Sequence, residues 1–166
     1  MKKTAVRQQK KVCAILFSWL FVLFCVSLSH AGSGWVQRVS PGSWSSYVQK
    51  AHVNHPDLAK KVDSVVMKLK ALHDEVKAAR CRMCNNAAGT LSNAKTEVEQ
   101  MYYALGGRPQ FGKNKVEGTF KNFNNYENRM KWRFPRTPQG KAWYDRWTKI
   151  KAEFNAIKPE ILSVVD

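Results

Sequence analysis

The sequence contains few of the residue patterns on which catalytic sites are usually built. It has no Gly-rich loop of the kind that binds phosphates, no nucleophilic Ser or Cys with a readable His–Asp framework, and no paired acids in an obvious cleft. An active site assembled across the fold would leave no such pattern, but nothing in the sequence argues for one. We therefore predict a protein that works by binding, with no catalytic residue and no cofactor.

Cysteine is also scarce, with four residues in a chain of 166. Cys13 and Cys25 lie near the N-terminus, and Cys81 and Cys84 form a Cys-x-x-Cys pair. A zinc site would need two further ligands at comparable spacing, and covalent haem attachment would need His where Asn85 stands. We favour a local disulfide that fastens the tip of a helical hairpin, and the alternatives are a redox-active dithiol and a metal-binding role.

Acidic residues are few, because 12 Asp and Glu stand against 28 Lys and Arg, which gives a net charge of +16. Such a surplus favours anionic partners, among them nucleic acid, lipid head groups, lipopolysaccharide and acidic proteins, and it selects none of them. His52 and His55 have the spacing of two metal ligands on a helix, but no cluster of carboxylates lies near them in the sequence. We therefore predict no metal site.

Long apolar runs are confined to the N-terminus. A lysine- and arginine-rich start precedes an apolar run from Val12 to Leu28, and small residues follow at Ser29 and Ala31. This layout predicts a secretory signal peptide over residues 1–31, and export of residues 32–166 as one periplasmic or extracellular domain without a membrane span. The alternative is an uncleaved membrane anchor, because the run approaches the length of a membrane span.

The sequence shows no strand alternation of convincing length, so the predicted class is all-α. Apolar residues instead recur at steps of three and four, the 3.5-residue period of helices packed against other helices. The first stripe comprises Leu58, Val62, Val65, Leu69, Leu72, Val76, Ala79 and Met83. The second comprises Ala87, Leu91, Ala94, Val98, Met101 and Leu105. The third comprises Trp143, Trp147, Ile150, Phe154 and Ile157.

The first two stripes are separated by Asn85–Thr90, whose Asn and Gly residues favour a helix stop. We predict that a helical hairpin turns there, which would place Cys81 and Cys84 at a helix C-terminus, where the helix dipole disfavours a thiolate. The alternative is a single helix over residues 57–105 with a stutter in its repeat. The hairpin is favoured because it lets the two stripes bury each other.

The C-terminal part predicts a pair of shorter helices. A loop over Gln110–Gly118 leads to a helix over Thr119–Lys131, and the last helix begins at Thr137 and Pro138, a cap residue followed by proline. Packed against the long hairpin, these helices give a three- to four-helix bundle. A further short helix is possible over Ser45–Val53.

The same part of the chain is basic and aromatic. Residues 108–151 hold 12 Lys and Arg against three acids, with aromatic residues interleaved. Cations beside aromatic rings suit single-stranded nucleic acid, and they suit carbohydrate or an acidic protein surface as well. The spacing of Trp143 and Trp147 predicts that they fill the core, which leaves Trp132 as the better surface candidate. The candidate residues for binding an anion or a partner are Arg129, Lys131, Trp132, Arg133, Arg136, Lys141 and Arg146.

Two segments, Gly118–Tyr126 (GTFKNFNNY) and Trp143–Trp147 (WYDRW), resemble the TrbJ-type periplasmic proteins of conjugative type IV secretion systems, the minor-pilin or pilus-tip class. The resemblance implies a non-catalytic, exported component of a bacterial envelope transfer apparatus. Such a component would contact pilin subunits or a recipient surface, and it would have protein partners in the cell envelope and possible oligomers. The resemblance assigns no site residue. The alternative function is a basic periplasmic module that binds an anionic polymer or an acidic protein.

Overall fold

The computed structural model describes residues 43–165, which belong to one unit of the chain, and the fold is reported for these residues. The predicted signal peptide, residues 1–31, lies outside them. Among the described helices, none combines the length and the apolar character that crossing a membrane requires.

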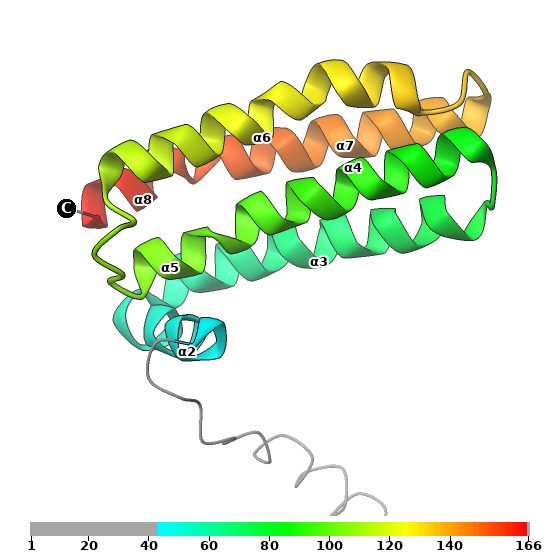
Figure 1. The fold of residues 1–166 in the computed structure, drawn as a ribbon. Coiled ribbons are helices and arrows are strands. Elements are labelled where there is room, and N and C mark those ends of the chain that lie inside the picture. The colour runs from blue at the N-terminus through cyan, green and yellow to red at the C-terminus, as the bar shows by residue number, and fades with distance from the viewer. Residues whose placement is uncertain (1–42, 166) are drawn as a thin grey trace, which may run out of the picture. The chain divides into compact units, whose positions relative to one another are not determined.

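Residues 43–165 form seven helices and no strand, which confirms the predicted all-α class. The helices are α2 (Trp44–Asn54), α3 (Pro56–Ala78), α4 (Arg82–Glu99), α5 (Met101–Leu105), α6 (Lys113–Arg133), α7 (Pro138–Ala156) and α8 (Lys158–Val164). In Figure 1 the long helices α3, α4, α6 and α7 lie side by side, and the chain reverses direction from each to the next. The short helices α5 and α8 continue α4 and α7 respectively.

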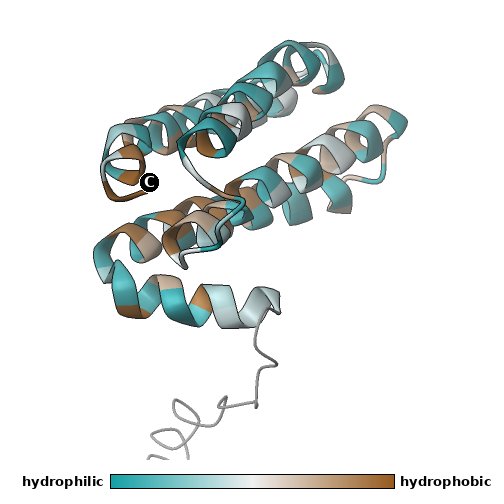
Figure 2. Cartoon of the chain, turned by 60° about the vertical axis from the view of Figure 1, so that its left-hand side comes forward, coloured by the Kyte–Doolittle hydropathy of each residue, from teal (hydrophilic) through white to brown (hydrophobic). Residues whose placement is uncertain are grey.

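The four long helices form an up–down–up–down bundle. Helix α3 packs against α4 and α7, and α4 also packs against α6, so that two antiparallel hairpins face each other. Helix α2 crosses one end of the bundle and packs on α3 and α5. Hydrophobic and hydrophilic positions are interleaved along every long helix, as amphipathic helices with one buried face require (Figure 2).

The apolar stripes meet in this core. Every member of the second and third stripes is buried, and so are the six members of the first stripe from Leu58 to Val76. Each large aliphatic or aromatic side chain buried in this way contributes roughly 1.5–3 kcal/mol. The short helix expected over Ser45–Val53 is α2, and Thr137 caps α7 as predicted, because its Oγ1 accepts a hydrogen bond of 3.0 Å from the Gly140 amide.

The hairpin between α3 and α4 turns earlier than predicted. Helix α3 ends at Ala78, and the chain reverses through Arg80, which has a left-handed φ of 53°. Helix α4 begins at Arg82, with Cys81 as its N-cap, so the turn predicted over residues 85–90 is wrong. The stripe accordingly stops before Met83, whose side chain is 40% exposed.

Two effects explain this shift. The Asn and Gly residues of the 85–90 segment lie on the exposed face of α4, where each costs at most about 1 kcal/mol of helix propensity. Burial of Ala87 and Leu91 on the opposite face of the same turns outweighs that cost. The backbone amides in the first turn of α4 have no acceptor within the helix. One of them is satisfied by the N-cap residue, because the Cys84 amide donates to the Sγ of Cys81 over 3.0 Å.

Helix α6 is longer than predicted. It begins at Lys113 and not at Thr119, so most of the loop expected over residues 110–118 is helical. Val116 explains the extension, because it is fully buried and continues the apolar face of Phe120 and Phe123 by one helical turn.

A half-buried polar cluster joins α6 to α7. Glu127 of α6 accepts hydrogen bonds from the Tyr144 hydroxyl, from Trp147 Nε1 over 3.0 Å and from Lys151 Nζ over 3.0 Å. The side chains of Glu127 and Lys151 are each only 26% exposed. Burial alone would raise the pKa of Glu127, but the three hydrogen bonds and the charge of Lys151 outweigh burial and lower it.

A candidate anion-binding end of the bundle

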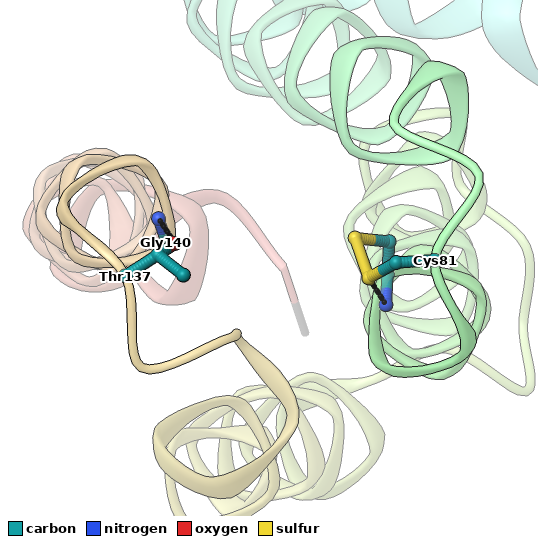
Figure 3. Close-up of a disulfide and its surroundings, with 4 residues drawn as sticks. Cys81, Thr137 and Gly140 are labelled. Atoms are coloured by element: carbon teal, nitrogen blue, oxygen red, sulfur yellow. Dashed lines mark hydrogen bonds between the residues drawn. A yellow bond between two sulfur atoms is a disulfide. The ribbon is translucent and has the colours of Figure 1, made fainter.

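The α3–α4 turn and the α6–α7 loop lie at the same end of the bundle, because both follow helices that run in the same direction (Figure 1). Cys81 and Cys84 form a disulfide in the first turn of α4. Figure 3 looks on this end and shows the disulfide on one side and the Thr137–Gly140 cap of α7 on the other. Because the turn precedes Cys81, the predicted placement of the cysteine pair at a helix C-terminus is wrong, while its predicted disulfide is confirmed.

The α6–α7 loop is held by close packing. Phe134 ends α6 and is buried, with its ring centroid 6.3 Å from that of Trp143. Gly140 lies against the backbone of Pro135, where an added Cβ would come within 1.9 Å of the Pro135 carbonyl oxygen. Only glycine fits at this position, and the loop is therefore fixed on the first turn of α7.

Seven exposed Lys and Arg side chains surround this end of the bundle, and we refer to these seven residues together as the cationic end. None of them has a carboxylate within 4.0 Å among residues 43–165, whereas seven of the thirteen other lysines in that range form ion pairs. Close like charges without acidic partners raise the local positive potential, which favours an anionic ligand. The cationic end comprises Lys77, Arg80, Arg82, Arg129, Lys131, Arg133 and Arg136.

Arg133 also connects the two hairpins. Its guanidinium donates to the Thr90 Oγ1 over 2.7 Å and to the Asn86 carbonyl oxygen over 3.2 Å, both of them on α4. This contact brings the basic end of α6 beside the first turns of α4. Arg133 therefore has a structural role that Lys131 and Arg136 do not share.

Trp132 is a surface residue, as predicted, with 65% of its area exposed. The guanidinium of Arg136 lies over its ring at 5.7 Å from the centroid, a cation–π arrangement. Beside them the loop forms an open groove of about 530 Å³, lined by Phe134, Tyr144, Lys131, Arg136 and Lys141 among others. The groove is therefore lined by both aromatic and cationic side chains. Trp143 and Trp147 are buried in the core, as their spacing predicted.

Two of the predicted binding residues are already occupied by acids. Lys141 pairs with Asp145 over 2.8 Å, although it still lines the groove. Arg146 pairs with Glu75 of α3, which also accepts a hydrogen bond of 2.8 Å from Trp143 Nε1. Hydrogen bonds from Trp143 and then from Arg146 lower the pKa of Glu75. Arg146 is therefore less available to a ligand than the other candidates.

Three residues of the cationic end, Lys77, Arg80 and Arg82, were not among the predicted candidates. The early turn places them at the tip of the hairpin, whereas a turn at residues 85–90 would have left them along a helix.

Elsewhere, His52 lies 3.3 Å from Asp63, and residues 43–165 contain no group of three or more His, Cys, Asp or Glu side chains arranged to hold a metal ion.

Comparison of the chain with protein-family models, with curated proteins and with solved structures gives no match.

Proposed function

We propose that this protein is a binding module whose cationic end holds single-stranded nucleic acid. The proposal depends most on one observation, the set of exposed cations without acidic partners that two separate turns bring together. Each contact between such a cation and a phosphate releases counterions, so phosphate-bearing polymers gain affinity from a cluster of this kind.

The aromatic residues favour nucleic acid over other polyanions. Trp132 offers an exposed ring beside Arg136, and a base can stack on such a ring for about 1–3 kcal/mol. The neighbouring groove is large enough for part of a nucleotide, with Tyr144 in its wall and Lys131 at its rim. Lipopolysaccharide and acidic proteins would use the cations but gain nothing from base stacking, and they are the alternatives that the experiment separates.

The experiment measures the anisotropy of a labelled single-stranded oligonucleotide at a series of salt concentrations. The affinity should fall with salt at a logarithmic slope of about −0.7 per phosphate contacted. The double variant Lys131→Glu, Arg136→Glu should lose at least tenfold in affinity. The matched control Lys113→Glu, Lys121→Glu changes the net charge equally, at positions of α6 away from the cationic end, and should lose much less.

A third variant separates stacking from charge. Trp132→Ala should weaken nucleic-acid binding by roughly 5- to 150-fold, the equivalent of one stacked base, and leave polyphosphate binding unchanged. Equal losses in the two charge variants, or affinity that is independent of salt, would refute the proposal. A loss confined to the cationic-end variant without any effect of Trp132→Ala would indicate a polyanion without bases.

The role in an envelope transfer apparatus stays a prediction, supported by the sequence of residues 1–31 and by the resemblance of residues 118–126 and 143–147. Deletion of the gene should lower DNA transfer between cells if that prediction is right, and unchanged transfer would count against it.

A further inference from the structure

The Cys81–Cys84 disulfide has features that a purely structural crosslink does not require. It closes a loop of only four residues, which limits its entropic effect on the unfolded chain to about 2 kcal/mol. The turn is also held without it, because α3 and α4 pack along their length and the Cys81 carbonyl accepts the Asn85 amide over 2.9 Å. The turn therefore does not depend on this bond alone.

The two cysteines differ in their exposure. Cys84 is 2% exposed, whereas Cys81 is half-buried at the turn that precedes the helix. A thiol or disulfide from another molecule should therefore reach Cys81 more readily than Cys84. This asymmetry provides one attacking sulfur and one sulfur that resolves the mixed disulfide from inside.

The surroundings stabilise a negative charge on Cys81. The Cys84 amide already donates to its Sγ, and the free amides at the N-terminus of the 18-residue α4 carry partial positive charge toward it. Arg80 and Arg82 flank the cysteine on both sides, and neither has an ion-pair partner among residues 43–165. A thiolate gains from each of these groups, so Cys81 is a good nucleophile when reduced and a good leaving group when its mixed disulfide with a partner is attacked.

We propose that Cys81 and Cys84 form a dithiol–disulfide exchange site that passes two electrons between this protein and a cysteine pair in an acidic polypeptide. In one direction a partner thiolate attacks the Cys81 Sγ, the Cys81–Cys84 bond breaks, and Cys84 leaves as a thiolate and takes a proton from water. The second partner thiol then loses its proton to water and attacks the partner sulfur of the mixed disulfide. Cys81 leaves as a thiolate, the partner is oxidised to a disulfide, and this protein is reduced to the dithiol.

The reverse sequence reduces a partner disulfide, and the partner's redox state decides the direction. An acidic partner is inferred from the charge of the tip, where Lys77, Arg80 and Arg82 would face it. The proposal goes beyond nucleic-acid binding, with which it shares the cations Lys77, Arg80 and Arg82. Its reactive group is the disulfide of the α3–α4 turn and not the groove of the α6–α7 loop, so thiol exchange and nucleic-acid binding can fail separately.

The test uses two matched variants of the full chain in which Cys13 and Cys25 are also replaced by serine, so that each variant keeps one cysteine of the pair. Reduced Cys84→Ser retains the more exposed cysteine and should form a mixed disulfide with oxidised glutathione. Mass spectrometry measures the rate at which this adduct forms. Cys81→Ser retains only the buried sulfur and should react at least tenfold more slowly. When the pH is lowered from 8 to 6, the rate of the Cys84→Ser reaction should fall by less than tenfold. The rate of an ordinary thiol would fall by about 80-fold over the same range, because its thiolate fraction falls by that factor.

The charge of the partner is tested separately. Adding Arg80→Gln and Arg82→Gln to Cys84→Ser should slow the reaction with anionic oxidised glutathione several-fold more than that with neutral hydroxyethyl disulfide. The neutral reagent reports only the lost stabilisation of the thiolate, and the additional slowing of the anionic reagent reports the attraction between charges. If either single-cysteine variant fails to fold, brief alkylation of the reduced wild-type chain gives the same answer, since Cys81 should be labelled well before Cys84. Equal labelling of both cysteines, or an ordinary pH dependence, would overturn the proposal.

Discussion

Replacement of Glu127 by glutamine should destabilise the protein at neutral pH by about 2 kcal/mol. Its carboxylate accepts three hydrogen bonds, one of them from the fully buried Trp147, and it pairs with Lys151. A glutamine side chain has a single acceptor oxygen, and its amide group would face the remaining donors. Loss of one hydrogen bond to a charged group costs roughly 1.5–3 kcal/mol, which sets the expected size of the effect.

The effect should depend on pH. The pKa of Glu127 in the folded protein is below its ordinary value of 4.5, because the hydrogen bonds from Tyr144, Lys151 and Trp147 outweigh the effect of burial. A carboxyl whose pKa is lowered by folding stabilises the fold fully above the unfolded-state pKa, and that contribution is lost as the pH falls through the folded-state pKa. The difference between wild type and Glu127→Gln should therefore be complete at pH 7 and shrink below about pH 4.5.

Urea unfolding followed by circular dichroism, at intervals from pH 7 to pH 3.5, measures this difference. With a slope near 2 kcal/mol per molar urea, the midpoint at pH 7 should move by about 1 M. Glu117→Gln is the matched control, because Glu117 is exposed on the same helix and has no ion-pair partner in residues 43–165. The control should change stability by less than about 0.5 kcal/mol. A Glu127→Gln loss that is the same at pH 7 and at pH 3.5 would refute the reasoning.

Two further predictions concern packing, and each has its own control. Gly140→Ala should destabilise the protein by several kcal/mol or displace the loop, since its Cβ would overlap the Pro135 carbonyl, whereas Gly89→Ala meets nothing within 4 Å and should add up to about 1 kcal/mol of helix stability. Thermal melting of the two variants should move in opposite directions. Leu69→Ala should cost about 2–5 kcal/mol in urea unfolding, and Met67→Ala, at a side chain 70% exposed, should cost almost nothing. Comparable losses at both positions would contradict the core assigned to α3.

The helices could be predicted because one strong signal dominates them. In each of the three stripes, which contain Leu69, Leu91 and Trp147 respectively, apolar residues recur every 3.5 residues on average. That spacing alone determines which face of each of these helices is buried. The position of the α3–α4 turn depends on weaker effects. Asn85 and Gly89 have low helix propensities, but the burial of neighbouring side chains outweighs that cost. Helix propensities and apolar spacing, taken from the sequence, do not show which of these two effects is larger.

The candidate site shows a similar division. The basic segment from Arg129 to Arg136 could be found because its residues are neighbours in the sequence. Lys77, Arg80 and Arg82 join it only through the antiparallel arrangement of the hairpins, across roughly 50 intervening residues. The ion pair between Arg146 and Glu75 could not be predicted, because the two residues lie 71 positions apart in the sequence and no spacing rule connects them. Arg146 was therefore included among the candidate binding residues.

The uneven placement of charge gives the molecule a direction. Toward the end where α5 and α8 finish, carboxylates such as Asp57, Glu99 and Glu160 accompany the cations, while the seven residues of the cationic end lie without ion-pair partners at the opposite tip. Positive charge is therefore concentrated at the tip, and an electric moment runs along the bundle axis. Near a negatively charged surface or polymer this moment exerts a torque and turns the approaching molecule until the tip leads. The bundle would then stand upright on its target and project α2 and α8 outward, where a second molecule could be met.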